Sequence, residues 1–156
     1  MKVQDLMSKS AISCRSETSL AAAGAMMWEH DCGILPIVDE AGKVTAVITD
    51  RDICIALSTR DAPSSQITVG DVVKPNALVC APEDDIQVAL KRIGEGKVHR
   101  LPVVNSEGIL VGLLSINDII LRAEKGDGRK PGIAYEELIG VLKAICEHQP
   151  LHALAA

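Results

Sequence analysis

The chain of 156 residues predicts an α/β (α+β) protein built from two tandem β-α-β-β-α units and a C-terminal helix. The sequence matches itself at a constant spacing of 66 residues, which indicates a duplicated unit. Within each copy, the hydrophobic pattern changes from a helical to a strand-like period at the same positions. Apolar residues make up 47% of the chain and aromatic ones 1%, so the core is expected to be aliphatic.

The internal repeat aligns residues 3–57 with residues 69–123 without a gap, and 13 of the 55 aligned pairs are identical. Most other pairs keep their polarity, so we interpret the two halves as a duplication. The identical pairs are Val3/Val69, Asp5/Asp71, Ala11/Ala77, Cys14/Cys80, Glu17/Glu83, Ala23/Ala89, Glu29/Glu95, Leu35/Leu101, Pro36/Pro102, Val38/Val104, Gly42/Gly108, Asp52/Asp118 and Ile53/Ile119.

Each copy begins with a short helical turn, followed by a brief extended piece around Ile12–Cys14 or Leu78–Cys80. Polar cap sites at Thr18–Ser19 and Asp84–Asp85 then open an amphipathic helix. Apolar residues follow at the spacing of a buried stripe, namely Leu20, Ala23, Gly24 and Met27 in the first copy, and Ile86, Ala89, Leu90 and Ile93 in the second.

Two β-rich runs come next in each copy and predict a hairpin. The first copy reads ILPIV and VTAVIT around the turn DEAG, and the second reads LPVV and ILVGLL around NSEG. A second helix follows directly, as DRDICIALS or INDIILRAE. A unit of about 55 residues buries little surface alone and leaves a sheet edge open, so the two copies are expected to pack face to face about a pseudo-twofold axis.

The predicted organisation is a first repeat over residues 1–60, a polar linker over 61–68, a second repeat over 69–124, and a spacer with a C-terminal helix over 125–156. Docking of this last helix on its own repeat and packing on a second subunit are both open at this point. Its apolar stripe must be buried in either case, and consists of Leu138, Val141, Leu142 and Ile145.

The composition argues against several classes of protein. A net charge of −5 disfavours a broad phosphate-binding surface, and one Trp with one Tyr cannot form base-stacking platforms, so we expect no nucleic-acid partner. No apolar run reaches the roughly 18 residues of a membrane span, and the N-terminus lacks the apolar block of a signal peptide. We therefore expect no membrane association and a cytoplasmic protein. Five cysteines without a C-x-x-C pair suit reduced thiols there.

Motifs of known enzyme classes are missing from the sequence. It contains no nucleophile elbow, no GK[ST] phosphate loop and no G-x-G-x-x-G, and an enzyme acting through Cys32 would lack a paired base. His30 with Cys32, and Cys146 with His148 and His152, have side chains suited to zinc but form no closed ligand set. The sequence thus favours a non-enzymatic protein without a metal site.

A hydroxyl and a carboxylate three residues apart open the second helix of each copy, as Thr49/Asp52 and Ser115/Asp118. At a helix N-terminus, the hydroxyl and the free backbone N–H groups can hold a phosphate, because the helix dipole favours an anion. The carboxylate only accepts hydrogen bonds, so it can take both hydroxyl protons of a ribose. The alternative is an ordinary capping box without a ligand. The recurrence in one register favours a ligand role in at least one copy.

The stretches PIVDEAGKVTAVITDRD and PVVNSEGILVGLLSIND resemble the hairpin and second-helix signature of CBS (cystathionine-β-synthase-type) domains. Two in tandem resemble the CBS pair, or Bateman module, over residues 3–123, and the whole layout is similar to stand-alone bacterial CBS-pair proteins. Two positions depart from the family pattern, because Ala46 stands where glycine is favoured and Asn105 stands where aspartate is typical.

This resemblance implies a regulatory module that binds an adenine-containing ligand in the clefts between the repeats, with no covalent cofactor. The ligands it implies are AMP, ADP, ATP, NAD(H) or S-adenosylmethionine. The string HRLPVV resembles nucleotide-sensing repeats in which this His and Arg, here His99 and Arg100, face phosphate, whereas the first copy has Gly33–Ile34. Arg51 is a candidate for a second cation.

The resemblance also implies a homodimer in which two CBS pairs form a flat disc. The rival hypothesis is a ligand-free structural or interaction protein that acts on an unknown protein partner through the dimer and the C-terminal helix. Aliphatic residues beside the extended pieces and at the start of the hairpins are candidates to sandwich an adenine, although core packing alone also explains them: Ile12, Ile34, Leu35, Pro36, Leu78, Leu101 and Pro102.

Overall fold

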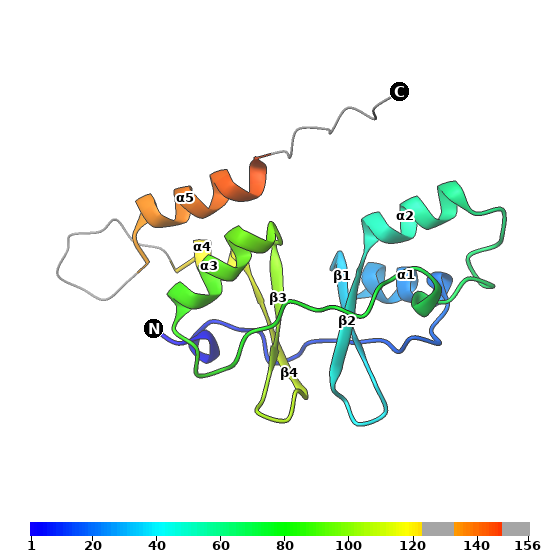
Figure 1. The fold of residues 1–156 in the computed structure, drawn as a ribbon, viewed down its shortest axis with the longest axis horizontal. Helices are drawn as coiled ribbons and strands as arrows, with labels where there is room; N and C mark the ends of the chain where they lie inside the picture. The colour runs from blue at the N-terminus through cyan, green and yellow to red at the C-terminus, as the bar shows by residue number, and fades with distance from the viewer. Residues whose placement is uncertain (123–132, 148–156) are drawn as a thin grey trace.

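The computed structural model describes residues 1–122 and 133–147, and it confirms the tandem α/β architecture (Figure 1). Each half holds an antiparallel two-stranded sheet flanked by helices. The predicted spacer, His148 and His152 lie outside the described residues. In chain order the elements are η1 (Val3–Asp5), α1 (Leu20–Glu29), β1 (Ile34–Val38), β2 (Val44–Thr49), α2 (Asp50–Thr59), η2 (Val69–Asp71), α3 (Ile86–Gly96), β3 (Arg100–Val104), β4 (Leu110–Ser115), α4 (Ile116–Ile120) and α5 (Tyr135–Cys146).

The two hairpins are equivalent residue by residue. The pairing of β1 with β2 recurs 66 positions later in β3 and β4, so that Ile34 opposite Thr49 becomes Arg100 opposite Ser115. Both ladders shift register at the equivalent point beside the turn. The glycine of each turn has a left-handed φ, of 80° at Gly42 and 83° at Gly108, which a side chain would disfavour.

The first strand predicted for each copy is shorter than expected. It consists of a single parallel bridge, Cys14 with Ile37 in the first repeat and Cys80 with Val103 in the second. Immediately after each bridge, the chain makes a turn that leads to the polar cap of the following helix. In the first repeat, the Thr18 amide donates to the Arg15 carbonyl across this turn at 3.1 Å. This turn leaves no room for a longer ladder.

The first helical turn of each copy packs on the core of the other copy. Val3 is fully buried among the apolar residues of the second repeat, and Val69 among those of the first. Backbone hydrogen bonds also join each of these turns to the other repeat. The Val3 amide donates to the Asp84 carbonyl at 3.0 Å, and the Val69 amide donates to the Thr18 carbonyl at 2.8 Å. Each packed core therefore takes one segment from the other side of the linker.

The predicted helical stripes face these cores. In α1, three stripe residues are buried and Gly24 is half-buried, whereas all four stripe residues of α3 are buried. Burial of an aliphatic side chain contributes about 1.5–3 kcal/mol, so these stripes account for much of the stability of the fold. Among the described residues, no polar or charged side chain is buried, which confirms the aliphatic core.

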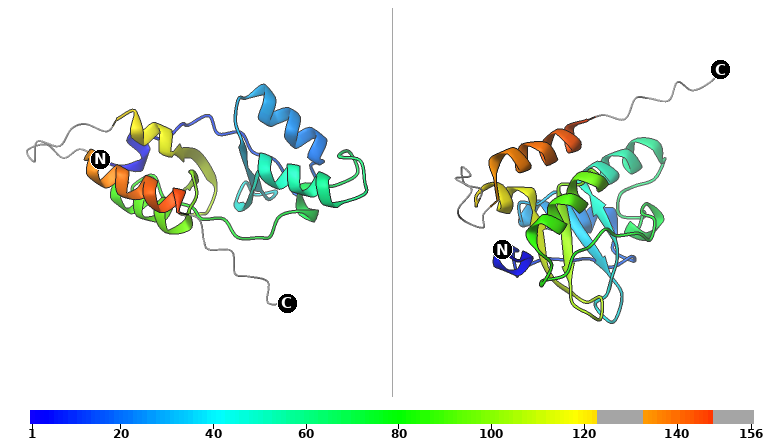
Figure 2. Two further views of the ribbon diagram at one scale, coloured as in Figure 1. Left: turned by 90° about the horizontal axis from the view of Figure 1, so that it is seen from above. Right: turned by 60° about the vertical axis from the view of Figure 1, so that its left-hand side comes forward.

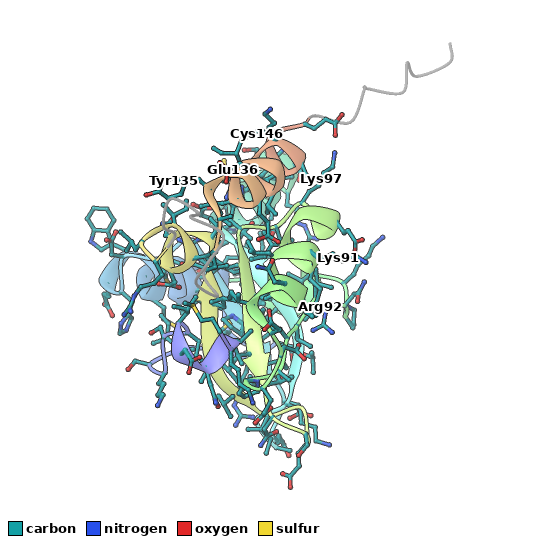
Figure 3. The ribbon with its side chains drawn as sticks, turned by 90° about the vertical axis from the view of Figure 1, so that its left-hand side faces the viewer. Lys91, Arg92, Lys97, Tyr135, Glu136 and Cys146 are labelled. Atoms are coloured by element: carbon teal, nitrogen blue, oxygen red, sulfur yellow. The ribbon has the colours of Figure 1, made fainter. Side chains whose placement is uncertain are left out.

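The C-terminal helix α5 docks on its own chain, where it lies over α3 (Figures 1–3). Gly94 faces α5, and a Cβ atom there would make ordinary van der Waals contact with Val141 at 3.7 Å and Ala144 at 3.8 Å. Ile133 and Leu138 are buried in the core of the second repeat. Of the two alternatives left open by the sequence, the structure has the helix on its own repeat.

The equivalent face of α1 carries no such cover among the described residues. Trp28 occupies the position equivalent to Gly94, and its side chain is 88% exposed. No atom would lie within 4 Å of a Cβ added at Gly24. The duplicated scaffold is therefore covered on one repeat and open on the other.

The turns of the two hairpins are joined to each other, on the side of the molecule away from the helices (Figure 1). The Val44 amide donates to the Gly108 carbonyl at 3.0 Å, and the Leu110 amide donates to the Gly42 carbonyl at 3.1 Å. These two bonds are related by the same spacing as the rest of the repeat, so they lie about the pseudo-twofold axis.

Gly112 and Ala46 occupy the same position in the two hairpins and test the packing of the N-terminal segment. A Cβ atom at Gly112 would lie 2.8 Å from the Ser8 carbonyl oxygen. We predict that Gly112→Ala lowers the free energy of unfolding by about 1–3 kcal/mol, because a backbone segment must move. The reverse change, Ala46→Gly, should lower it by about 1 kcal/mol through chain entropy. Urea denaturation measures both, and an unchanged midpoint for Gly112→Ala would contradict the close approach.

Candidate ligand-binding site

The hydroxyl and carboxylate pairs at the starts of α2 and α4 have the same geometry. Asp52 Oδ2 accepts hydrogen bonds from the Thr49 amide at 2.9 Å and from the Thr49 hydroxyl at 2.7 Å. Asp118 Oδ2 accepts from the Ser115 amide at 2.8 Å and from the Ser115 hydroxyl at 2.6 Å. Both pairs are complete capping boxes, which is the alternative that the sequence left open.

Capping uses only one oxygen of each carboxylate. The Oδ1 atoms of Asp52 and Asp118 receive no hydrogen bond from the described residues, and both side chains are half-buried. A carboxylate has about four acceptor positions, so a capping role and a ribose contact are compatible. The ribose assignment stays a prediction.

A cleft of about 560 Å³ opens between α1, the start of α2 and the start of β3. This volume lies within the usual range of small-molecule sites. Arg100 comes to the cleft from the second repeat, while every other lining residue comes from the first, so the cleft lies between the repeats as predicted. The lining residues are Gly24, Met27, Trp28, Asp31, Cys32, Gly33, Asp50, Ile53 and Arg100.

Three charged side chains line this cleft, namely Asp31, Asp50 and Arg100. The guanidinium of Arg100, which is half-buried, has no carboxylate within 4.0 Å among the described residues. Asp50 Oδ1 accepts from the amide of Arg51 at 2.8 Å, whereas its Oδ2 receives no hydrogen bond from that same part of the chain. The cleft thus offers one unpaired cation and two carboxylates.

Two smaller hollows hold some of the other predicted residues. One of about 100 Å³ brings together His99, Arg100 and Ser115 at the start of α4. Arg100 lines both this hollow and the cleft, so it connects them. Asp52 lies in a separate hollow of about 190 Å³ beside Val72.

The remaining predicted polar residues line none of these three hollows. They are Thr49, Arg51 and Asp118. Arg51 is exposed on α2, and the other two are half-buried in their capping boxes. The structure therefore groups the predicted phosphate residues of the second repeat around Arg100, but it does not bring Asp52 into the same hollow.

Most residues predicted to sandwich an adenine lie in the two cores. The exceptions are Ile12, which is half-buried, and Leu78, whose side chain is 40% exposed. The central strands β1 and β3 carry the others, and their position between the bridging segment and the outer strand of each hairpin buries them. These buried residues are Ile34, Leu35, Pro36, Leu101 and Pro102.

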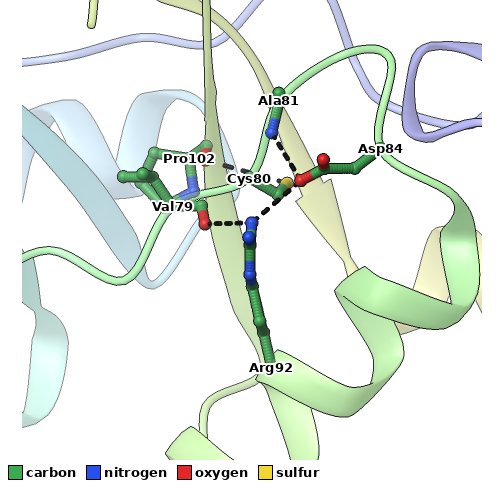
Figure 4. A network of polar contacts seen from close by, with 6 residues as sticks. All are labelled: Val79, Cys80, Ala81, Asp84, Arg92 and Pro102. Atoms are coloured by element: carbon green, nitrogen blue, oxygen red, sulfur yellow. Dashed lines mark hydrogen bonds and ion pairs between the residues drawn. The ribbon is translucent and has the colours of Figure 1, made fainter.

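An ion pair anchors the segment before α3 in the second repeat (Figure 4). Arg92 Nη1 donates to Asp84 Oδ2 at 2.8 Å and to the Val79 carbonyl at 3.0 Å. The Ala81 amide donates to the same carboxylate oxygen at 3.0 Å. This network fixes the strand-like piece that carries Leu78. The first repeat has methionine and threonine at the positions of Arg92 and Asp84, so its equivalent segment lacks the ion pair.

Sequence reasoning missed the lining residues Trp28, Asp31 and Asp50, which match no motif and differ between the copies. Cys32 was considered there only as a zinc ligand or a nucleophile. The difference between the copies is itself a usable signal, since the equivalents of Asp31 and Asp50 in the second repeat are a lysine and an isoleucine. A charge that appears in only one copy of a duplicated unit is not required by the shared fold.

The buried cysteines have unreactive thiols. Burial raises the pKa of Cys14 from its ordinary 9.0 to about 11 and that of Cys80 to about 12. The carboxylate of Asp84 adds to the increase at Cys80, and the Arg92 guanidinium opposes it. All five cysteines are unpaired thiols.

No three His, Cys, Asp or Glu side chains within residues 1–122 and 133–147 gather as a metal site. His30 and Cys32 are therefore not joined there by a third ligand. In those same residues, no helix combines the length and the apolar character that crossing a membrane requires.

The model of the CBS domain family matches the chain twice, over residues 3–59 and 69–125. The chain is 31% identical over 116 residues to Hypoxic response protein 1 of Mycobacterium tuberculosis, covering 74% of this chain and 80% of that protein. It is 30% identical over 125 residues to inosine-5'-monophosphate dehydrogenase of Mycobacterium leprae, covering 76% of this chain but 22% of that enzyme. The chain spans only about a fifth of the length of such enzyme relatives.

Two solved structures have a similar fold. The CBS domain pair of protein MJ0100, in complex with 5'-methylthioadenosine and S-adenosyl-L-methionine, has a TM-score of 0.70 at 26% identity, covering 78% of this chain and 94% of that one. Hypoxic Response Protein I with two coordinated zinc ions has a TM-score of 0.69 at 28% identity, covering 78% and 98% of the two chains.

The raised thiol pKa values predict a loss of stability at high pH. Unfolded thiols ionise near 9.0, whereas the folded protein holds both protons up to about 11 and 12. The free energy of unfolding should therefore be unaffected by these thiols below pH 9 and should fall as the pH rises from 9 to 11. Urea denaturation across this range measures the slope. The double substitution Cys14→Ala with Cys80→Ala should flatten it, and Cys54→Ala should not; equal slopes would contradict the assignment.

Proposed function

The chain belongs to the CBS domain family as a tandem pair, and from this membership we propose that it is a non-enzymatic regulatory module that binds an adenine-containing ligand between its repeats. The proposed ligands are AMP, ADP, ATP, NAD(H) or S-adenosylmethionine, held without a covalent cofactor. The observation that carries the proposal is the cleft to which the second repeat contributes Arg100 and the first contributes the other walls.

The proposed contacts follow from the chemistry of the described residues. Among residues 1–122 and 133–147, the Arg100 guanidinium pairs with no carboxylate, and its fork suits a bidentate anion such as phosphate or carboxylate. His99 and Ser115 share a hollow with it, and together with Thr49 and Arg51 they are the proposed anion-binding residues. Asp52 and Asp118 each have an unused oxygen for ribose hydroxyls. Ile12 and Leu78 have the accessible apolar surface that an adenine contact needs.

Relatives support a regulatory role in preference to a catalytic one. The pair in MJ0100 is named in complex with 5'-methylthioadenosine and S-adenosylmethionine. Relatives named as enzymes share only about a fifth of their length with this chain. A ligand that contacts both repeats favours the arrangement in which they lie closest, and it shifts the equilibrium only by its differential affinity for the two arrangements.

The competing function is that of a ligand-free adaptor, whose C-terminal helix contacts another protein. The docking of α5 on α3 disfavours this role, because the apolar stripe of α5 is already used within the chain. Mass spectrometry of small molecules released from the purified, denatured protein separates the two candidates. A thermal-shift panel of adenine compounds provides the second measurement.

We propose further that two chains associate through their helical side, in a reducing cytoplasm that keeps the five thiols unpaired. An apolar surface of this extent is typical of an interface, and the occupant that fits it is a second copy with the same surface. Exposed apolar side chains on or beside helices include Ile55, Leu57, Val88, Ile120, Leu121, Tyr135 and Ile139.

The proposed ribose contact predicts that replacing Asp52 or Asp118 weakens ligand binding, while stability falls no more than when another helix cap is replaced. Asp52→Asn and Asp118→Asn keep the size of the side chain and remove its charge. We expect the affinity for the adenine ligand to fall about 10- to 100-fold at the cleft that binds. Because Arg100 comes only from the second repeat, one substitution should abolish most binding and the other should change it little. Titration calorimetry with AMP, ATP, NAD and S-adenosylmethionine measures this.

Asp71 provides the matched control, since it forms the same capping box with Thr68, at 2.9 Å from the amide and 2.7 Å from the hydroxyl, and lines none of the three hollows. Asp71→Asn should lower the thermal midpoint as the other two changes do and leave binding intact. If all three variants bind every ligand as the parent does, the carboxylates are helix caps only.

The proposed dimer predicts twice the mass of one chain by light scattering at micromolar concentration. Leu121, whose side chain is 81% exposed, is the most suitable position for disruption. Leu121→Asp should shift the mass to that of a monomer, because a buried carboxylate without a partner is unfavourable. Ser106→Asp, in the hairpin turn on the other side, should not. A monomeric parent protein would rule out self-association.

A further inference from the structure

The open cleft of the first repeat has a filled counterpart in the second repeat. The residues equivalent to Gly24, Met27, Asp50 and Ile53 are all buried there, under Ile133, Leu138 and α5. These equivalents are Leu90, Ile93, Ile116 and Ile119. Among the described residues, the C-terminal helix therefore closes one of these two related positions, and the other is open.

The open position is also chemically different from its counterpart. Asp50 replaces the buried Ile116, and Asp31 replaces Lys97. The substitutions make the charge of the cleft lining −1, from the carboxylates of Asp31 and Asp50 and the guanidinium of Arg100. The cleft is thus acidic around its one cation.

Asp31 is placed against the preference of its local structure. It follows the C-terminal end of α1 with a left-handed φ of 49°, and its amide donates to the Trp28 carbonyl at 3.3 Å. A helix C-terminus favours a cation, and Lys97 supplies one at the equivalent position with a φ of 50°. An anion at this end of a helix is unfavourable with respect to the helix dipole. The left-handed backbone is common to both repeats, so the charge is the feature that distinguishes Asp31.

We propose that this cleft selects S-adenosylmethionine over AMP, ADP, ATP and NAD, an inference that rests on the function proposed above. The amino-acid tail of this ligand carries one carboxylate, one ammonium and one sulfonium. These groups complement one guanidinium and two carboxylates. The ligand carboxylate pairs with Arg100, and the two cationic centres lie toward Asp31 and Asp50.

Phosphate ligands fit the same charges poorly. A phosphate on Arg100 also faces the two carboxylates, and the repulsion grows with each added phosphate. Met27 and Ile53 give the cleft an apolar wall, and Trp28 gives it an aromatic face. The closed second position predicts one ligand per chain.

The experiment measures dissociation constants and stoichiometry on the full chain by titration calorimetry. Emission of Trp28, the single tryptophan, reports occupancy independently. The probes are S-adenosylmethionine, S-adenosylhomocysteine, 5'-methylthioadenosine, AMP, NAD, ADP and ATP, the last with and without Mg²⁺. S-adenosylhomocysteine isolates the sulfonium charge, and 5'-methylthioadenosine lacks the amino-acid tail. We expect S-adenosylmethionine to bind about tenfold or more tightly than each of the others, at one per chain.

Charge variants test the assignment of the two carboxylates. Asp31→Asn and Asp50→Asn should each weaken S-adenosylmethionine about tenfold and should leave AMP unchanged or strengthen it. Asp31→Asn should also raise the thermal midpoint of the free protein, because it removes an anion from a helix C-terminus. Asp61→Asn, an exposed position in the linker outside the cleft, changes the net charge equally and should leave every affinity unchanged.

The outcomes separate this inference from the function on which it rests. If AMP, NAD or ATP binds as tightly as S-adenosylmethionine, or if Asp31→Asn and Asp50→Asn leave the ratio of affinities unchanged, the charge selection is wrong while the regulatory module stands. If no probe binds, both are wrong. If two ligands bind per chain, α5 does not close the second position.

Discussion

The reciprocal exchange of Val3 and Val69 between the two cores is the contact on which the remaining structure depends. Val3 is buried in the core of the second repeat, and Val69 is buried in the core of the first. Burial of each valine contributes about 1.5–3 kcal/mol, and the paired backbone bonds fix its direction. The exchange therefore restricts the relative movement of the two repeats. A cleft that takes Arg100 from one repeat and Asp50 from the other has a defined shape only because of this.

The two repeats share one fold, but α5 covers only the second of them, and this difference explains the location of the candidate site. The duplicated fold creates two related positions, and α5 closes the one on the second repeat. Small differences between the copies then acquire large effects. Gly94 packs against α5 in the second repeat, whereas Trp28, at the equivalent position of the first repeat, borders the open cleft. The residues that differ between the copies here, such as Asp50 and Ile116, are ones that the shared fold does not require.

Most of the fold could be predicted from the sequence because its signals are local and occur twice. The hairpins and the helical stripes follow from periodicity, and the turn glycines confirm the register. The exchange of Val3 and Val69 could not be predicted, because a buried valine gives no sign of which core contains it. The first strand was overestimated for a related reason, since extended residues such as Ile12 and Leu78 do not reveal whether a turn ends the ladder after one bridge.

The candidate site was predictable only in part. Thr49 and Asp52 are readable as a motif, and the structure completes them as a cap. Arg100 lines the cleft, and its contact with a ligand anion stays a prediction. Asp31 and Asp50 belong to no motif, and their importance depends on the approach of two repeats that are far apart in sequence. Burial of Leu35 and Leu101 in the cores also depends on tertiary packing, which aliphatic character alone does not specify.

The hydrogen bonds between the two hairpin turns set the kind of motion that the pair can undergo. They tie the repeats at one end, so relative movement becomes a rotation about an axis near Gly42 and Gly108. Strands of six residues extend roughly 20 Å from this axis. A rotation of about 5° at the turns therefore displaces the far ends by about 2 Å. A small closure of the cleft would therefore move the helices at the far ends of the strands by about this distance.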